Sequence, residues 1–93
     1  MIVGSAKVTI HVPWVHSLKE KRMVVKSLCA KTCNKFNVSI AEVEEQDIHQ
    51  IVVLGISAVS THLVQTESIL DEVVRFIESN TEGEVTNIER EIY

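Results

Sequence analysis

Apolar and polar residues alternate over residues 2–12, IVGSAKVTIHV, near the start of the chain. A period of two is typical of a strand with one buried face. Pro13 cannot donate a hydrogen bond to a sheet and favours an extended conformation at the residue before it, so we expect the strand to end there. The predicted buried face consists of Ile2, Gly4, Ala6, Val8, Ile10 and Val12.

The hydrophobic spacing becomes that of an amphipathic helix after residue 17. Ser17 and Glu20 match a capping box, in which the hydroxyl accepts from the third helical N–H and the glutamate reaches back to the N–H of the cap. A helix is therefore predicted to begin at Leu18. Its apolar arc contains Leu18, Val25, Leu28, Cys29, Thr32 and Phe36.

Two strand-like stretches follow, residues 38–44 (VSIAEVE) and residues 49–60 (HQIVVLGISAVS). The polar, acidic connection between them is short enough for a hairpin. The second stretch is the more apolar, as expected of a central strand. Apolar residues then recur on one helical side over residues 62–79, which predicts a second helix capped by Ser60 or Thr61.

The end of the chain combines a turn signal with a more polar strand. Residues 80–83 are typical of a helix stop, and residues 84–93 (EVTNIEREIY) predict the last strand. Val85 and Ile88 have opposite parity, which predicts either a β-bulge or a weakly specified edge strand. The order βαββαβ in so short a chain favours an α+β fold. We predict a single ferredoxin-like domain over residues 1–93, a plait whose four-stranded antiparallel sheet has two helices on one face.

Composition narrows the class of protein. A chain of 93 residues with 45% hydrophobic content suffices for one core. The longest apolar run, residues 51–56, is too short to cross a bilayer, and Met1 leads directly into a strand pattern rather than a signal peptide. Cys29 and Cys33 lie four apart in the predicted helix, which favours free, buried or half-buried structural thiols over a disulfide. We expect a cytoplasmic protein that contacts no membrane.

The net charge of −4 conceals a strong asymmetry along the chain. Residues 1–40 contain seven Lys or Arg against Glu20 alone, a net charge of +6, whereas residues 41–93 contain twelve acids against two Arg, a net charge of −10. Such polarity gives different surfaces of a small domain opposite electrostatic fields. It bears on the choice of partners and not on the fold.

The start of the predicted first helix is basic, with Lys19, Lys21 and Arg22 in about its first turn and Lys26 one turn later. Cations there face the positive end of the helix dipole, and each costs about 0.3–1 kcal/mol when exposed. Free N–H groups beside long cations are suited to binding phosphate, so these residues form a candidate nucleic-acid or anion site. The alternative is a solvated helix face, with Lys21 covering apolar surface with its stem.

Trp14 and His16 lie in the loop before this helix and complete the candidate anion-binding set. Trp14 is a candidate stacking platform for a base, although a loop aromatic more often closes the end of a core. His11 and His16 make a weak metal signal, because no carboxylate or thiol lies near them in sequence. The acidic stretch at residues 42–47 is a second weak candidate for a divalent cation, and an acidic hairpin is usually just solvated.

No catalytic residue or cofactor is predicted. A phosphate cradle of the acylphosphatase kind, which shares this architecture, needs a glycine-rich loop with an arginine, and residues 13–17 contain neither. Ser17 is better explained as a helix cap, and neither cysteine lies at a predicted helix start. Aromatic residues are also absent from the two expected central strands, so the classical RNA-recognition surface of the plait is missing.

Several segments together resemble the YlxP-like family of small bacterial proteins. They are HSLKEKR (16–22), FNVSIAEV (36–43), QD (46–47), VLGIS (53–57), RFIE (75–78) and EREI (89–92). The resemblance runs nearly end to end. It implies a ferredoxin-like domain of uncharacterised function, whose genes often lie among those for translation and ribosome maturation. The chain departs from the family's richly basic first helix at residues 29–33, Cys-Ala-Lys-Thr-Cys, which argues against a strong nucleic-acid surface there.

Two main hypotheses of function follow, and an enzyme is a third, less favoured interpretation. The first is a non-enzymatic accessory domain that contacts structured RNA or the ribosome through Lys19, Lys21, Arg22 and Lys26, with recognition by shape and charge. The second is a protein-interaction module that uses the acidic hairpin or an exposed sheet edge. A homodimer through the open sheet face belongs to this second hypothesis.

Overall fold

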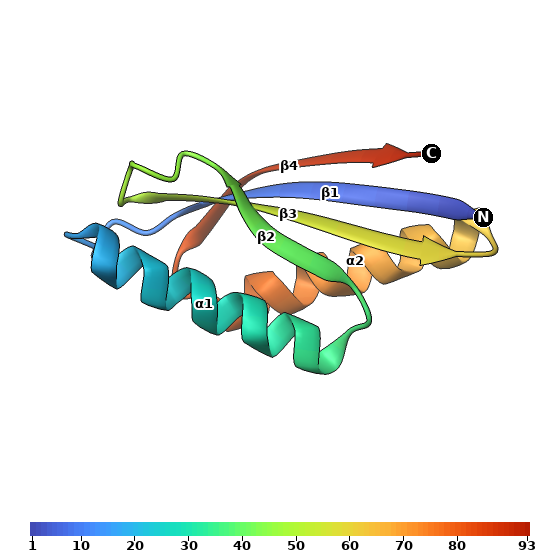
Figure 1. Ribbon diagram of the computed structural model, residues 1–93, viewed down its shortest axis with the longest axis horizontal. Helices are drawn as coiled ribbons and strands as arrows, with labels where there is room; N and C mark the ends of the chain where they lie inside the picture. Colours follow the sequence, from blue (N-terminus) through green and yellow to red (C-terminus); the bar gives the residue numbers. More distant parts are fainter.

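Four strands form one antiparallel sheet in the order β2-β3-β1-β4, and both helices lie on the same side of it (Figure 1). The computed structural model describes all 93 residues. The elements are β1 (Ile2–His11), α1 (Leu18–Lys35), β2 (Ser39–Glu44), β3 (Ile51–Ser60), α2 (Leu63–Asn80) and β4 (Glu84–Ile92). The predicted βαββαβ plait is therefore confirmed.

The core lies between the helices and the two central strands. Alternation in β1 buries one face as predicted, with Val8 and Ile10 fully buried, and only Ile2 of the predicted set stays half-exposed. In β3, Leu54 and Ile56 point the same way, and α2 covers them with a row of buried residues. That row is Leu70, Val73, Val74 and Ile77. Neither helix is both long and apolar enough to cross a membrane.

The start of α1 is capped as predicted. The Ser17 hydroxyl accepts from the backbone N–H of Glu20 at 3.1 Å. The reciprocal half of the capping box is not formed, because the Glu20 carboxylate accepts from the Ser17 hydroxyl at 3.5 Å instead of reaching the backbone N–H of Ser17. The cap therefore satisfies one N–H of the first turn.

Ser17→Ala is expected to lower the free energy of unfolding by about 1 kcal/mol, because the N–H of Glu20 loses its acceptor. Urea denaturation measures this change. Ser27→Ala is the matched control, since Ser27 is exposed in the middle of α1 and makes no cap. Alanine is the better helix former, so the control variant should be as stable as the wild type or slightly more so. Equal losses in the two variants would contradict a capping role.

The predicted cap of α2 is wrong. His62 occupies the N-cap position without a side-chain cap bond, and the helix begins at Leu63. Ser60 is still the last residue of β3, and its hydroxyl bonds the Thr66 hydroxyl at 2.5 Å and accepts from the N–H of His62 at 3.3 Å. The serine thus ties the strand to the first turn of α2 from outside the helix.

Two β-bulges set which side chains face the helices. In β4, Thr86 is the extra residue between the pairs Thr9–Asn87 and Ile10–Val85, so the predicted bulge is confirmed. In β2 the register shifts between Glu42 and Glu44 against β3. Because of this second bulge, Glu42 lies on the helix side of the sheet and Glu44 on its open side.

Candidate nucleic-acid interface

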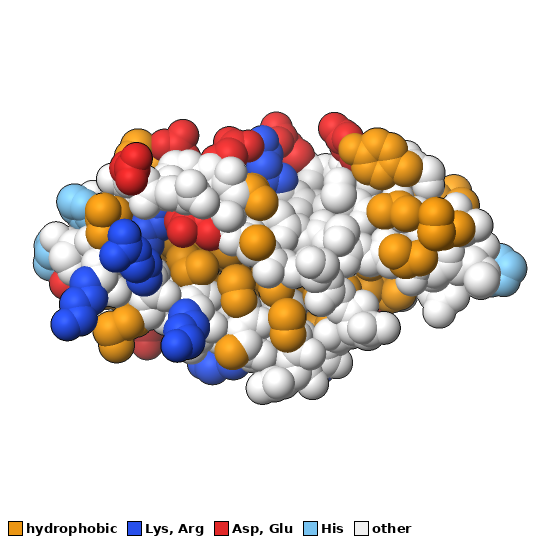
Figure 2. Space-filling view, in the orientation of Figure 1, with side chains coloured by type: hydrophobic (Ala, Val, Ile, Leu, Met, Phe, Trp, Pro, Cys, Tyr) orange, Lys and Arg blue, Asp and Glu red, His pale blue; other side chains and the backbone are white.

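The exposed flank of α1 presents Lys19, Arg22 and Lys26, which we call the basic flank. All three side chains are exposed, and none forms an ion pair within the protein. At about 100° per residue they lie within about 60° of one another on the helix surface. Figure 2 shows Lys and Arg side chains gathered over the N-terminal half of α1, with acidic side chains along the opposite rim of the molecule.

Lys21 lies elsewhere, and its assignment to the anion-binding set is wrong. Lys21 is only 1% exposed and lies on the core-facing side of α1. The ammonium Nζ donates to the backbone carbonyls of Glu45 at 2.5 Å and Ile48 at 2.6 Å, and its distance to Glu42 Oε2 is 2.8 Å. The ammonium is buried, bonds two backbone carbonyls and is paired with a carboxylate inside the protein, so it is not accessible to an external phosphate.

The lysine holds the connection between β2 and β3 against α1. Glu45, whose carbonyl it binds, has a positive φ of 56° and marks the sharp turn after β2. Glu42 Oε2 is buried and has no hydrogen-bond partner, although it lies 2.8 Å from the ammonium of Lys21. The contact between Lys21 and Glu42 is therefore an ion pair that balances a half-buried carboxylate.

Trp14 does not lie beside the basic flank. The indole is 39% exposed and lines a hollow of about 310 Å³ between α1 and residues 80–82, together with Met23, Ser27 and Lys31. Ser27 and Lys31 lie about 100° and 140° around α1 from Lys26, and Met23 lies between them and the basic flank. His16 is exposed next to the helix cap, and the structure gives it no partner. The predicted set is thus not one surface: three cations form the basic flank, Lys21 is buried, and Trp14 lies at a separate hollow.

The residues considered as weak metal-ligand candidates do not lie together in the folded chain. Glu42 pairs with Lys21 under the helix, whereas Glu44 accepts from Lys7 on the open side of the sheet. His11 lies in β1 on the open side, whereas His16 follows the strand in a loop. No three His, Cys, Asp or Glu side chains come together in a way that holds a metal ion.

The two cysteines differ in environment. Cys29 is half-buried against the core, as predicted, whereas Cys33 is exposed, with its Sγ 3.9 Å from the carbonyl oxygen of Val38. Burial, and then the neighbouring Cys33 and Glu42, raise the pKa of the Cys29 thiol. A raised pKa keeps the Cys29 thiol protonated and lowers its reactivity as a nucleophile.

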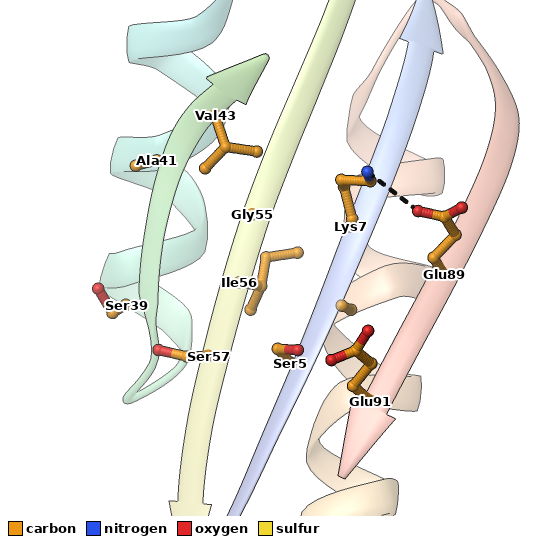
Figure 3. Close-up of a pocket in the computed structure, with 11 residues that line it drawn as sticks. Ser5, Lys7, Ser39, Ala41, Val43, Gly55, Ile56, Ser57, Glu89 and Glu91 are labelled. Carbon is orange, nitrogen blue, oxygen red and sulfur yellow. Dashed lines mark ion pairs between the residues drawn. The ribbon is translucent and has the colours of Figure 1, made fainter. Parts of the chain in front are cut away.

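The open side of the sheet contains a feature that sequence reasoning missed. Lys7 in β1 is held by Glu44 of β2 at 2.7 Å and by Glu89 of β4 at 3.1 Å, so one ammonium joins both edge strands. The hydrogen bonds that Lys7 donates to Glu44 and then to Glu89 raise the pKa of Lys7. Beside it lies a hollow of about 440 Å³ (Figure 3). The alternation of β1 placed Lys7 on the outer face, but its partners depend on strand pairing.

Comparison with known proteins identifies relatives in sequence and in fold. Residues 3–90 match the family described as "Protein of unknown function (DUF503)". The chain is 51% identical over 70 residues to "Uncharacterized protein YlxP" of Bacillus subtilis (strain 168), which covers 75% of the chain and 76% of the relative.

Two solved structures share the architecture. A de novo designed protein with ferredoxin fold matches 99% of the chain and 85% of its own length, with a TM-score of 0.61 and 18% identity. The de novo designed protein Foldit4 matches 99% of the chain and 94% of its own length, with a TM-score of 0.51 and 13% identity. At such low identity the likeness concerns the fold alone.

Proposed function

We propose that the chain, which belongs to the DUF503 family of proteins of unknown function, is a small non-enzymatic domain that contacts structured RNA through the basic flank of α1. The contact is electrostatic, made to phosphates by Lys19, Arg22 and Lys26. Lys21 has a structural role in this proposal, and Trp14 lies outside the contact surface.

The observation that supports the proposal is the absence of ion pairs on the basic flank. The other half of the molecule has an excess of acids, and Lys7, Lys21 and Arg90 are all ion-paired there or in the interior. The three flank cations instead stay exposed and unpaired, and Lys19 lies in the first turn of α1, where the positive end of the helix dipole makes a cation unfavourable. An external polyanion would offset this cost.

The spacing of the three cations suits a phosphate backbone. With a rise of about 1.5 Å per residue, Lys19 and Lys26 are about 10 Å apart along the axis of α1. This length allows contact with two or three neighbouring phosphates of one strand. The contact would position RNA by its shape and charge, since the open face of the sheet presents no stacking aromatic on β1 or β3.

The test is the affinity for a fluorescently labelled RNA duplex of about 16 base pairs, measured by anisotropy over a range of salt concentrations. Lys19→Ala with Arg22→Ala and Lys26→Ala should weaken binding by about tenfold at low salt. The slope of log affinity against log salt should become shallower by about two to three, because each lost phosphate contact releases about one counterion fewer. Co-sedimentation with ribosomal particles at low salt should be lost in the same variant.

A matched control separates a local contact from net charge. Lys31→Ala with Lys35→Ala and Arg75→Ala removes the same three charges from exposed positions outside the basic flank. This control should keep most of the affinity and the salt slope of the wild type. Equal weakening in both triple variants, or a wild-type affinity that does not change with salt, would rule out the proposed contact.

A further inference from the structure

The open face of the sheet is acidic. Each strand pair places its partners on the same face, so the register puts four carboxylates there, those of Glu44, Glu84, Glu89 and Glu91. Lys7 is the one Lys or Arg among them, and it is held between two of these acids. The net charge of this face is therefore −3, opposite in sign to that of the basic flank.

Small side chains leave room in the middle of this face. The floor of the hollow is formed by Ser5, Gly55 and Ser57 on the two central strands. One wall comes from Ser39, Ala41 and Val43 of β2, and the other from Glu89 and Glu91 of β4 (Figure 3). A volume of about 440 Å³ accommodates one or two long side chains. Glu89 and Glu91 line one side of the hollow, and Lys7, which is paired with Glu89, lines it beside them.

Apolar side chains lie at one end of the same face. Val3 and Val59 are paired across β1 and β3, and Tyr93 pairs with Val3 on the other side. Val59 is 61% exposed and Tyr93 is 68% exposed. Figure 2 shows apolar side chains gathered at this end of the molecule, close to both chain termini. Val3 and Lys7 are four residues apart in β1, about 13 Å along an extended chain.

We propose that this open face binds an extended, basic segment of a partner protein. Arginine or lysine side chains of the segment would enter the hollow and meet Glu89 and Glu91, and an apolar residue about four positions away would cover Val3, Val59 and Tyr93. Charge complementarity favours this occupant, because a guanidinium can form paired hydrogen bonds with a carboxylate. RNA would be repelled by the same carboxylates.

A second copy of the chain fits this face less well. Two open faces brought together would place a net charge of −3 against the same charge, and the like charges would lose much of their water. A basic segment would instead bring opposite charges to the same carboxylates, so there would be no like-charge repulsion to overcome. The proposal is independent of the RNA contact, because the two surfaces share no residue.

The test uses a labelled ten-residue peptide that alternates arginine with threonine and ends in leucine, titrated with the full-length protein. Glu89→Gln with Glu91→Gln should weaken binding on the order of tenfold. Glu67→Gln with Glu78→Gln makes the same change of charge on the exposed side of α2 and should leave the affinity within about twofold of the wild type. The basic-flank triple variant should bind the peptide as the wild type does.

An uncharged variant tests the hollow itself. Ser57→Phe fills the floor without changing any charge, and a β-strand accommodates phenylalanine well. It should weaken peptide binding about as much as the double glutamine variant. No saturable binding by the wild type, equal losses in both double variants, or an unchanged affinity in Ser57→Phe would overturn the proposal. A homodimer in sedimentation velocity that Ser57→Phe dissociates would assign the face to a second copy and overturn it as well.

Discussion

Replacing Lys21 with methionine is expected to lower the free energy of unfolding by about 3–5 kcal/mol, the range for breaking a buried ion pair by removing one partner. Methionine keeps the apolar stem but leaves the half-buried carboxylate of Glu42 without its counter-charge. The carbonyls of Glu45 and Ile48 also lose their donor. A domain of this size has about 5–15 kcal/mol of stability in all, so the loss is a large fraction of the total.

Thermal and urea denaturation measure this loss, and the midpoint temperature should fall by about 15–30 °C. Lys26→Met is the matched control, because the side chain is exposed and unpaired on the same helix, and its effect should stay within about 0.5 kcal/mol. In Lys21→Met with Glu42→Leu the unpaired carboxylate is gone, so the double variant should lose less than the sum of the single losses. Equal stability of Lys21→Met and Lys26→Met would show that the buried contacts contribute nothing.

Lys21 shows which properties of a residue the helical spacing can predict and which it cannot. It lies in the core arc of α1, with the buried Leu28 two turns further along, so its inward position could have been predicted from spacing. The hydrogen-bond partners of Lys21 could not have been predicted from this spacing. Glu45 and Ile48 lie 24 and 27 residues further along the chain, and only the folded β2–β3 connection brings their carbonyls to the ammonium.

The elements themselves were largely predictable, because alternation and helical spacing are local properties of the chain. The exception is the start of α2, where Ser60 belongs to β3 and bonds Thr66 instead of capping the helix. The basic flank was predictable for the same local reason, since Lys19, Arg22 and Lys26 lie on one side of one helix.

The acidic open face depends on long-range register. Lys7 reaches Glu44 because of a bulge in β2 and reaches Glu89 because β1 pairs with β4. Neither partner is near Lys7 in sequence, and a one-residue change in register would move each carboxylate to the other face of the sheet. Composition shows that the second half of the chain is acidic. Strand pairing, however, determines that Glu89 and Glu91 line the hollow on the open face of the sheet.

Gly83 illustrates the same difference between local pattern and packing. The sequence places it in a turn after α2, where a positive φ would be the usual reason for glycine, yet no glycine in the chain has a positive φ. A Cβ built on Gly83 would lie 2.6 Å from the carbonyl oxygen of His11, 2.8 Å from Ile10 Cγ2 and 2.9 Å from Val12 Cγ1. The residue is glycine because the chain entering β4 passes directly over the end of β1.

Gly83→Ala is therefore expected to lower the free energy of unfolding by about 2 kcal/mol, within the range for overpacked sites. The closest obstacle is a backbone oxygen, which cannot move without disturbing β1. Gly55→Ala is the comparison, because its Cβ would meet Val43 Cγ1 at 2.7 Å, and Val43 is 48% exposed and can rotate away. That variant should lose less than about 1 kcal/mol, since alanine also reduces the entropy of the unfolded chain. Urea denaturation of both variants measures the difference, and a Gly83→Ala protein as stable as Gly55→Ala would show that the start of β4 can shift away from β1.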